Sequence, residues 1–214
     1  MSRHFTSGDF LFLLRGLEWT VALSLIAFVG GALIGLPLAL ARVSPIRLLR
    51  YAAYGYIRLL QGIPLLVLLF LALFMPGLYG WQIDPLTAAS VALSLNAAAF
   101  LGEIWRGSIE SVPSGQWEAA QVLGLHRFHC LIFIIYPQAL RISVPPTVGF
   151  LVQMIKATSL AAIIGFAELT RSGQLIINST HQPFLVFLII AVLYFALCWP
   201  LSTAASSLER RLLR

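Results

Sequence analysis

The chain has 214 residues, of which 59% are hydrophobic and only 10% are charged. Because soluble domains carry about 25% charged residues, this composition excludes an ordinary water-soluble domain and predicts an integral membrane protein. The net charge of +6 is interpreted as membrane topology, since no cluster of basic and aromatic residues indicates a nucleic-acid partner.

Apolar segments long enough to cross a bilayer, which takes about 20 residues, predict five transmembrane helices. They cover about residues 19–41, 53–74, 86–104, 143–166 and 184–202. A short apolar segment at residues 9–16, with charges at both ends, is expected to lie at the membrane interface ahead of the first span. Residues 168–183 form a polar connection before the last span. The sequence has no repeats or linkers, so it predicts one all-α domain over residues 1–214.

Glycine and proline mark two places where these spans depart from plain lipid-facing helices. Gly31 and Gly35 in the first span have the spacing that lets two helices pack closely. In the second span, Gly62 and Pro64 weaken the helix backbone next to Gln61. Broken helices with freed backbone groups are common where transporters hold their substrates.

The longest interruption between spans, residues 112–141, predicts two short helices joined by a glycine corner. Pro113 and Pro137 bracket it, because proline lacks an N–H and ends a helix. A first short helix is expected to end at Gly124, which tolerates a left-handed backbone. A second, at residues 128–136, is apolar but too short to cross a bilayer. Two short helices between membrane spans indicate a docking element.

The arginines orient the chain in the membrane. If the docking element is cytoplasmic, five crossings place the N-terminus outside and the C-terminus inside. Nine arginines then lie inside and three outside, which is the bias expected of cytoplasmic loops. The inner set is Arg42, Arg47, Arg50, Arg106, Arg127, Arg141, Arg210, Arg211 and Arg214, and the outer set is Arg3, Arg15 and Arg171.

No motif for catalysis or nucleotide binding is present in the sequence. A phosphate-binding loop needs a lysine directly after a glycine, whereas the only lysine, Lys156, follows Ile155. The sequence also lacks a serine nucleophile elbow and an HExxH metal site. Cys130 and Cys198 stand alone in apolar surroundings, as expected of buried thiols. We therefore expect no enzyme activity and no cofactor, and any driving force must come from a partner or an ion gradient.

Polar side chains inside the predicted spans are the remaining candidates, since an ionisable group in a bilayer is costly unless it is paired or hydrated. The set is Arg58, Gln61, Asn96, Glu103, Lys156, Thr158 and Ser159. They predict a wet path for a polar solute at the interface of two subunits. Structural pairing is the alternative, above all for Glu103, which precedes Arg106 by three residues on one helix face. Arg58 can snorkel to the inner interface, whereas Lys156 is expected near the middle of its span.

Several motifs resemble one family of membrane proteins. Glu118-Ala119-Ala120, Gly124 four residues later and Tyr136-Pro137-Gln138-Ala139-Leu140 resemble the EAA loop of ABC importer permeases. The segments Glu103–Ile109, Lys156–Leu160 and Leu208–Leu212 are similar to permeases of the polar amino acid uptake family. The resemblance covers nearly the whole chain, in order.

This resemblance implies a permease of the type I ABC importer fold in the inner membrane of a bacterium. It implies a second permease, identical or paralogous, an extracytoplasmic solute-binding protein that delivers an L-amino acid, and ATPase subunits that bind the ATP. Coupling to the ATPase is then expected at Glu118, Ala119, Ala120 and Gly124. The substrate path is expected at Arg58, Gln61, Glu103, Lys156, Thr158 and Ser159.

The sequence departs from the family inside the spans. The family usually has Arg-Gly-Thr-Pro where this chain has Gln61-Gly62-Ile63-Pro64. It often has an acidic residue at the position of Arg58 and another at the position of Ala157. A cavity lined by Arg58 and Lys156 would be net positive, so it predicts an acidic or amide solute. Two alternatives stay open: an ion-coupled secondary transporter or small channel using Glu103 or Lys156, and a membrane anchor without transport activity.

Overall fold

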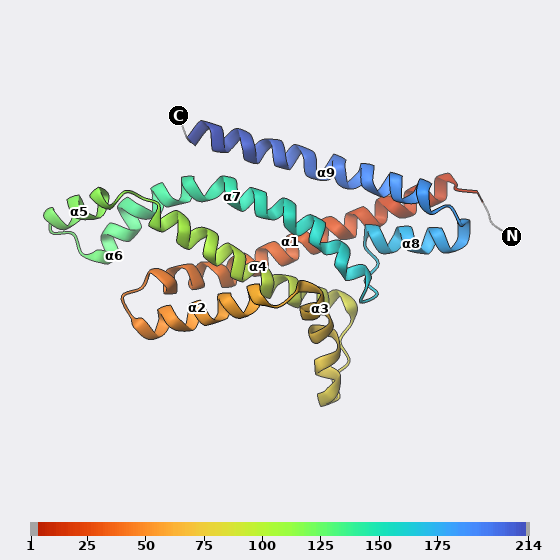
Figure 1. Cartoon of the computed structure of the whole chain (residues 1–214), viewed down its shortest axis with the longest axis horizontal. Coiled ribbons are helices and arrows are strands. Elements are labelled where there is room, and N and C mark those ends of the chain that lie inside the picture. Colours follow the sequence, from red (N-terminus) through yellow and green to blue (C-terminus); the bar gives the residue numbers. More distant parts are fainter. Residues whose placement is uncertain (1–3, 213–214) are drawn as a thin grey trace.

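The computed structural model of the chain describes residues 4–212, and every regular element in this range is helical (Figure 1). Four helical runs are long and apolar enough to cross a membrane: α1 (Ser7–Val43), α4 (Pro85–Glu110), the run Phe128–Ala162 that contains α7 (Tyr136–Ala157), and α9 (Pro183–Leu212). A bent pair, α2 (Arg47–Gly62) and α3 (Leu65–Phe74), supplies a fifth crossing. The predicted all-α membrane fold is confirmed. Arg3 and Arg214, which the orientation count includes, lie outside the described residues.

Helix α1 starts earlier than predicted. The side chain of Asp9 accepts a hydrogen bond from the backbone N–H of Thr6 at 2.9 Å, which caps the helix at its first turn. Residues 9–16 are therefore the beginning of α1, and the prediction of a separate interfacial segment is wrong. The helix has 37 residues and is about 55 Å long, more than the hydrocarbon core requires.

The core of the bundle is the contact between α1 and α4. A Cβ atom built on Gly31 would lie 2.4 Å from the Cβ of Ala97, and one built on Gly35 would lie 3.1 Å from the carbonyl oxygen of Ala98. Larger residues would push the two helices apart. The predicted role of this glycine pair in close helix packing is confirmed.

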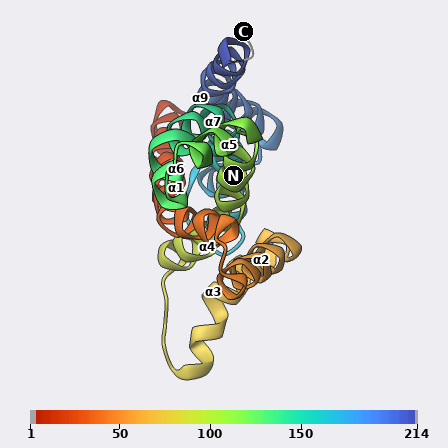
Figure 2. The same ribbon diagram turned by 90° about the vertical axis from the view of Figure 1, so that its left-hand side faces the viewer.

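The second span is not one helix. Helices α2 and α3 meet at a break at Ile63 and Pro64 and are bent by 99°. Pro64 has no N–H to continue the α2 ladder, and Gly62 weakens the turn before it. Helix α3 and the following 3₁₀ turn η1 (Met75–Tyr79) are directed away from the bundle (Figures 1 and 2). The weakened backbone predicted at Gly62 and Pro64 is confirmed, and the span predicted over residues 53–74 is a bent pair of helices.

The loop between α4 and α7 contains one free-standing short helix, α5 (Ser114–Val122). The second short helix predicted at residues 128–136 is not separate, because α6 (Arg127–Cys130), the π-helical turn η2 (Leu131–Ile135) and α7 follow one another directly. Pro137 does not end the helix. The N–H of Tyr136 bonds to the carbonyl of Leu131, five residues back, so the widened π turn accommodates the missing N–H of the proline.

The end of the bundle opposite α5 also differs from the prediction (Figure 1). Helix α7 ends at Ala157, and the 3₁₀ turn η3 (Thr158–Ala162) and Gly165, with φ +91°, complete the segment predicted as the end of the fourth span. The predicted polar connection over residues 168–183 is mostly helix α8 (Leu169–Thr180), which packs between α1 and α9. Its apolar face contains Leu169 and Ile176, both buried.

Candidate functional site

The tip of the loop is held by its glycine. The N–H of Gly124 donates to the carbonyl of Gln121 at 2.9 Å, and the N–H of Leu125 donates to the carbonyl of Ala120 at 3.0 Å. This pair of bonds is a Schellman cap, and it requires the left-handed backbone of Gly124, whose φ is +71°. The predicted glycine corner at the end of α5 is confirmed.

Helix α5 is anchored to the bundle by one face. Ala120 is only 1% exposed and packs in a cluster with Ile109, Val112, Cys130, Ile135 and Ala139. Glu118 and Ala119 are exposed. The EAA residues therefore divide into two roles: Ala120 fixes α5 to its own chain, while Glu118 and Ala119 face outward.

The most exposed apolar residues of this loop were not predicted. Val122 is 88% exposed and Leu123 is 75% exposed, and Leu125 is exposed beside them. We call these three residues the α5 tip. They surround the glycine cap, so its geometry holds them outward. The sequence did contain a signal for this exposed tip, since three apolar residues flank the glycine that ends the helix.

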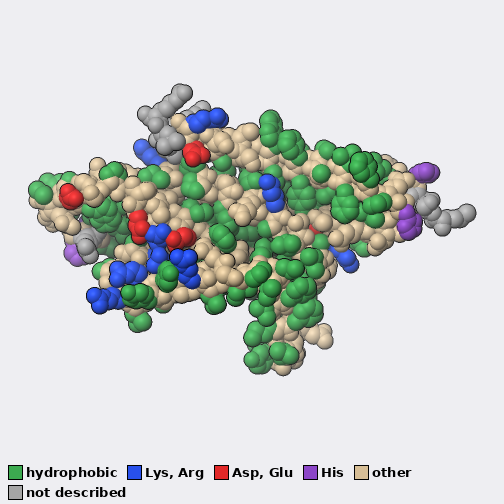
Figure 3. Space-filling model, viewed as in Figure 1, with side chains coloured by type: hydrophobic (Ala, Val, Ile, Leu, Met, Phe, Trp, Pro, Cys, Tyr) green, Lys and Arg blue, Asp and Glu red, His purple; other side chains and the backbone are tan. Residues whose placement is uncertain are grey.

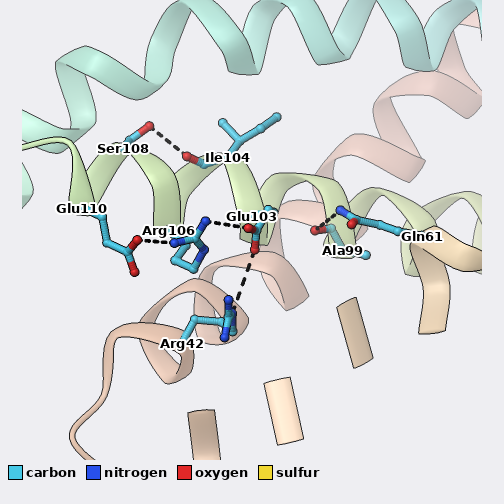
Figure 4. A network of polar contacts seen from close by, with 8 residues as sticks. All are labelled: Arg42, Gln61, Ala99, Glu103, Ile104, Arg106, Ser108 and Glu110. Atoms are coloured by element: carbon cyan, nitrogen blue, oxygen red, sulfur yellow. Dashed lines mark hydrogen bonds and ion pairs between the residues drawn. The ribbon is translucent and has the colours of Figure 1, made fainter. Parts of the chain in front are cut away.

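A pocket of about 250 Å³ lies where the break between α2 and α3 meets α4 and α7. Its polar side chains are three amides: Gln61 beside the break, Asn96 on α4 and Gln153 on α7. The Nε2 of Gln61 donates to the carbonyl of Ala99 on α4 at 3.4 Å (Figure 4). We call this cavity the central pocket. Ala157 also lines it, and none of its lining residues in the described part of the chain carries a charged side chain. The pocket can therefore hold a small polar group by hydrogen bonds alone.

Glu103 lies in an ionic network near the C-terminal ends of α1 and α4, outside the central pocket (Figure 4). One Arg106 nitrogen lies 2.6 Å from the Glu103 carboxylate, and the Nε of Arg42 lies 4.0 Å from it. A second nitrogen of Arg106 pairs with Glu110. The predicted pairing of Glu103 with Arg106 is present.

The two predicted cations of the substrate path lie outside the central pocket. The guanidinium of Arg58 lies over the ring of Tyr54, 5.2 Å from its centroid and one turn towards the N-terminal end of α2. Lys156 is in the last turn of α7, which ends at Ala157. A cavity shared by these two residues stays a prediction.

The hydroxyl residues after Lys156 bond to the chain itself. Thr158 is fully buried and donates to the carbonyl of Ile155 at 2.7 Å, and Ser159 donates to the carbonyl of Lys156 at 2.7 Å. These bonds close the 3₁₀ turn that follows α7. Of the six predicted path residues, Gln61 alone lines the central pocket.

A buried carboxylate at the start of α8 was not predicted from the sequence. Glu168 is 0% exposed and precedes α8, where it accepts hydrogen bonds from the N–H of Arg171 at 2.9 Å and the hydroxyl of Tyr194 at 2.9 Å. Thr20 of α1 lies 3.3 Å away. Burial raises the pKa of the Glu168 carboxyl above its ordinary value. The cluster joins α1, α8 and α9. Glu168 could have been identified from the sequence as a helix cap only if α8 had first been predicted as a helix.

Comparisons with known proteins give a consistent result. Residues 19–214 match the family described as binding-protein-dependent transport system inner membrane component. The L-cystine transport system permease TcyB of Bacillus subtilis is 38% identical, over 92% of this chain and 85% of its own length. The glutamine transport system permease GlnP of Escherichia coli is 35% identical, over 94% of this chain and 92% of its own. A crystal structure of an amino acid ABC transporter with histidines is 34% identical, with a TM-score of 0.91 over 99% of this chain and 100% of that chain.

Proposed function

Since the chain belongs to the family of binding-protein-dependent transport system inner membrane components, we propose that it is the membrane-spanning permease subunit of an ABC importer for an L-amino acid. The observation that carries the proposal is the α5 tip, in which Val122 and Leu123 extend from an anchored helix at one end of the bundle. An ATPase subunit binds this tip and supplies the energy, because the chain itself has no nucleotide-binding motif. ATP is thus bound by the partner.

The break in the second span supports a second permease subunit. The break leaves the last carbonyl groups of α2 without helical partners, and such groups cannot face lipid, since the hydrocarbon core offers no hydrogen-bond partners. Gly62 and Pro64 at the break are exposed in the single chain. This face therefore adjoins water and a second permease, identical or paralogous, and the solute path runs between the two.

The lining of the central pocket suggests the class of solute. Gln61, Asn96 and Gln153 offer both donors and acceptors but no net charge, so they suit an uncharged polar side chain better than a carboxylate or an ammonium group. The prediction of an acidic solute depends on Arg58 and Lys156 sharing a cavity, whereas neither residue lines the central pocket. We therefore favour an amino acid with an amide or another neutral polar side chain, delivered by an extracytoplasmic solute-binding protein.

The membrane orientation follows from the docking of the ATPase. With the α5 tip in the cytoplasm, the C-terminus is cytoplasmic, the N-terminus is outside, and α8 lies at the outer end, where the solute-binding protein arrives. This is the orientation that the arginine distribution favours.

Reconstitution tests the proposal. The complex, purified with its ATPase, is placed in proteoliposomes with ATP on the ATPase side and the loaded binding protein on the other, and uptake of labelled amino acids is measured. Uptake that requires ATP and survives collapse of the proton gradient supports an ABC importer. Uptake that stops with the gradient while ATP remains supports the ion-coupled alternative. Gln61→Leu is expected to lower uptake while ATPase binding is unchanged.

A further inference from the structure

Positive charge gathers where α1 passes into α2, at the same end as the α5 tip (Figure 3). We call the five arginines here the basic corner. It comprises Arg42 of α1, Arg47, Arg50 and Arg58 of α2, and Arg106 of α4. The adjacent carboxylates are Glu103 and Glu110, and Glu118 of α5 lines the same hollow as Arg50. Five arginines against three glutamates leave an excess of two positive charges.

Two of the three nearby carboxylates, Glu103 and Glu110, are already paired. Arg106 pairs with both Glu103 and Glu110, and Arg42 reaches the same Glu103 at 4.0 Å. Among residues 4–212, no carboxylate lies within 4.0 Å of Arg47, Arg50 or Arg58, as far as the side chains are described. Arg47, Arg50 and Arg58 therefore have no ion-pair partner within 4.0 Å in the described part of the chain, although the guanidinium groups of Arg50 and Arg58 lie over tyrosine rings.

Two buried donors in the corner are also unsatisfied. The Nε atoms of Arg42 and Arg106 are buried and have no hydrogen-bond partner. Arg42 is further constrained by the ring of Tyr54, whose centroid lies 4.9 Å from its Cζ. Buried N–H groups without acceptors are costly, and an anionic oxygen is the acceptor that guanidinium groups bind best.

The apolar neighbours of the corner identify the source of that anion. Ile46, Leu48 and Leu49 alternate with the arginines at the start of α2 and are exposed, Leu48 by 78%. This mixture of exposed apolar and basic residues is typical of the level of a bilayer where acyl chains meet headgroups. Basic pockets between membrane helices on the cytoplasmic side bind anionic lipid headgroups.

We infer that the basic corner binds the headgroup phosphate of an anionic phospholipid in the inner leaflet. Arg47 and Arg50 contact the phosphate from the water side, and Ile46 and Leu48 lie against the acyl chains. The site is separate from the central pocket, so this inference does not depend on which solute is carried. It depends on the proposed orientation, because the corner must face the leaflet on the ATPase side.

The test measures lipid binding rather than transport, so its outcome stands apart from that of the uptake assay. The complex is purified in detergent with its ATPase, and binding of spin-labelled phosphatidylglycerol and phosphatidylcholine is compared. The variant is Arg47→Gln combined with Arg50→Gln, which leaves the Glu103 network intact. The matched control is Arg141→Gln, an exposed arginine on α7 outside the corner.

Each arginine near an anionic surface contributes about fivefold to lipid binding, so the double variant is expected to bind phosphatidylglycerol about 30-fold more weakly. The control is expected to bind as the unchanged protein does. Equal binding of the two lipids by the unchanged protein, retained binding by the double variant, or an equal loss in the control would each overturn the inference. Displacement of the lipid by millimolar inorganic phosphate would identify a soluble anion instead. If the double variant fails to fold, Arg47→Lys with Arg50→Lys must retain the preference for phosphatidylglycerol.

Discussion

Replacing Gly124 by valine tests the link between the loop and the ATPase. The residue has φ +71°, and no atom lies within 4 Å of a Cβ built there, so the substitution adds backbone strain without a clash in the chain. A β-branched residue in the left-handed region costs about 1–2 kcal/mol. That cost lowers the population of the capped conformation by a factor of about 5–30. The α5 tip then loses its fixed position.

We expect the Gly124→Val protein to insert into the membrane normally but to couple ATP hydrolysis poorly to uptake. The assay compares ATP hydrolysis and amino acid uptake in the same proteoliposomes. Gly124→Asn is the matched control, because asparagine adopts the left-handed conformation at lower cost and should retain most of the coupling. Normal uptake by Gly124→Val would refute the reasoning, since the Schellman cap would then be dispensable for docking.

Four further predictions follow from the same structure. Serine at both Val122 and Leu123 should abolish co-purification of the ATPase while membrane insertion persists, and retained binding would place the docking surface elsewhere. A reporter fused to the C-terminus should be cytoplasmic and a tag at the N-terminus accessible from outside; a cytoplasmic N-terminus would contradict the proposed orientation. In a competition panel, amino acids with neutral polar side chains should compete best, and neither Arg58→Gln nor Lys156→Gln should change the order; a changed order would put these cations in the path. Because the raised pKa of Glu168 means that the folded chain binds more protons than the unfolded chain, stability should fall as pH rises from the ordinary carboxyl value through the raised one. Glu168→Gln should remove that dependence in thermal unfolding, and an unchanged pH profile would show that Glu168 is not its source.

The sequence predicted best those features that depend on local chemistry. Gly31 and Gly35 indicated close packing because small residues have few other uses in a membrane helix, and α1 and α4 do meet there. Gly124 indicated a helix end because its conformational freedom suits a left-handed cap. Membrane crossings were predictable because the bilayer fixes the length of an apolar segment.

Prolines were the least reliable signal because their effect depends on the bonds available around them. Pro64 breaks its span by 99°, beside a glycine. Pro137 breaks nothing, since the π turn before it moves the hydrogen-bond register by one residue. Pro145 and Pro146 also lie within α7. A rule about proline alone cannot distinguish these cases.

The composition of the site could not be predicted, because it depends on helix rotation and on where each helix ends. Lys156 and Gln153 are three residues apart, yet only Gln153 lines the central pocket. The polar character of residues 168–183 concealed α8, whose buried apolar residues, Leu169 and Ile176, are few but lie on one face. The buried Glu168 was hidden for the same reason, since its partners come from α1 and α9.

The continuity of α6, η2 and α7 joins the loop around α5 directly to the central pocket. A helical run from Arg127 to Ala157 is about 45 Å long. One end packs against Ala120 through Cys130 and Ile135, and the other carries Gln153 into the central pocket. Two separate short helices would have left a flexible joint between loop and span. Under the proposed function, a displacement of α5 by the ATPase is carried along one helical rod to the amide-lined pocket. Gly124→Val tests the loop end of this connection, because it loosens α5 without touching the rod.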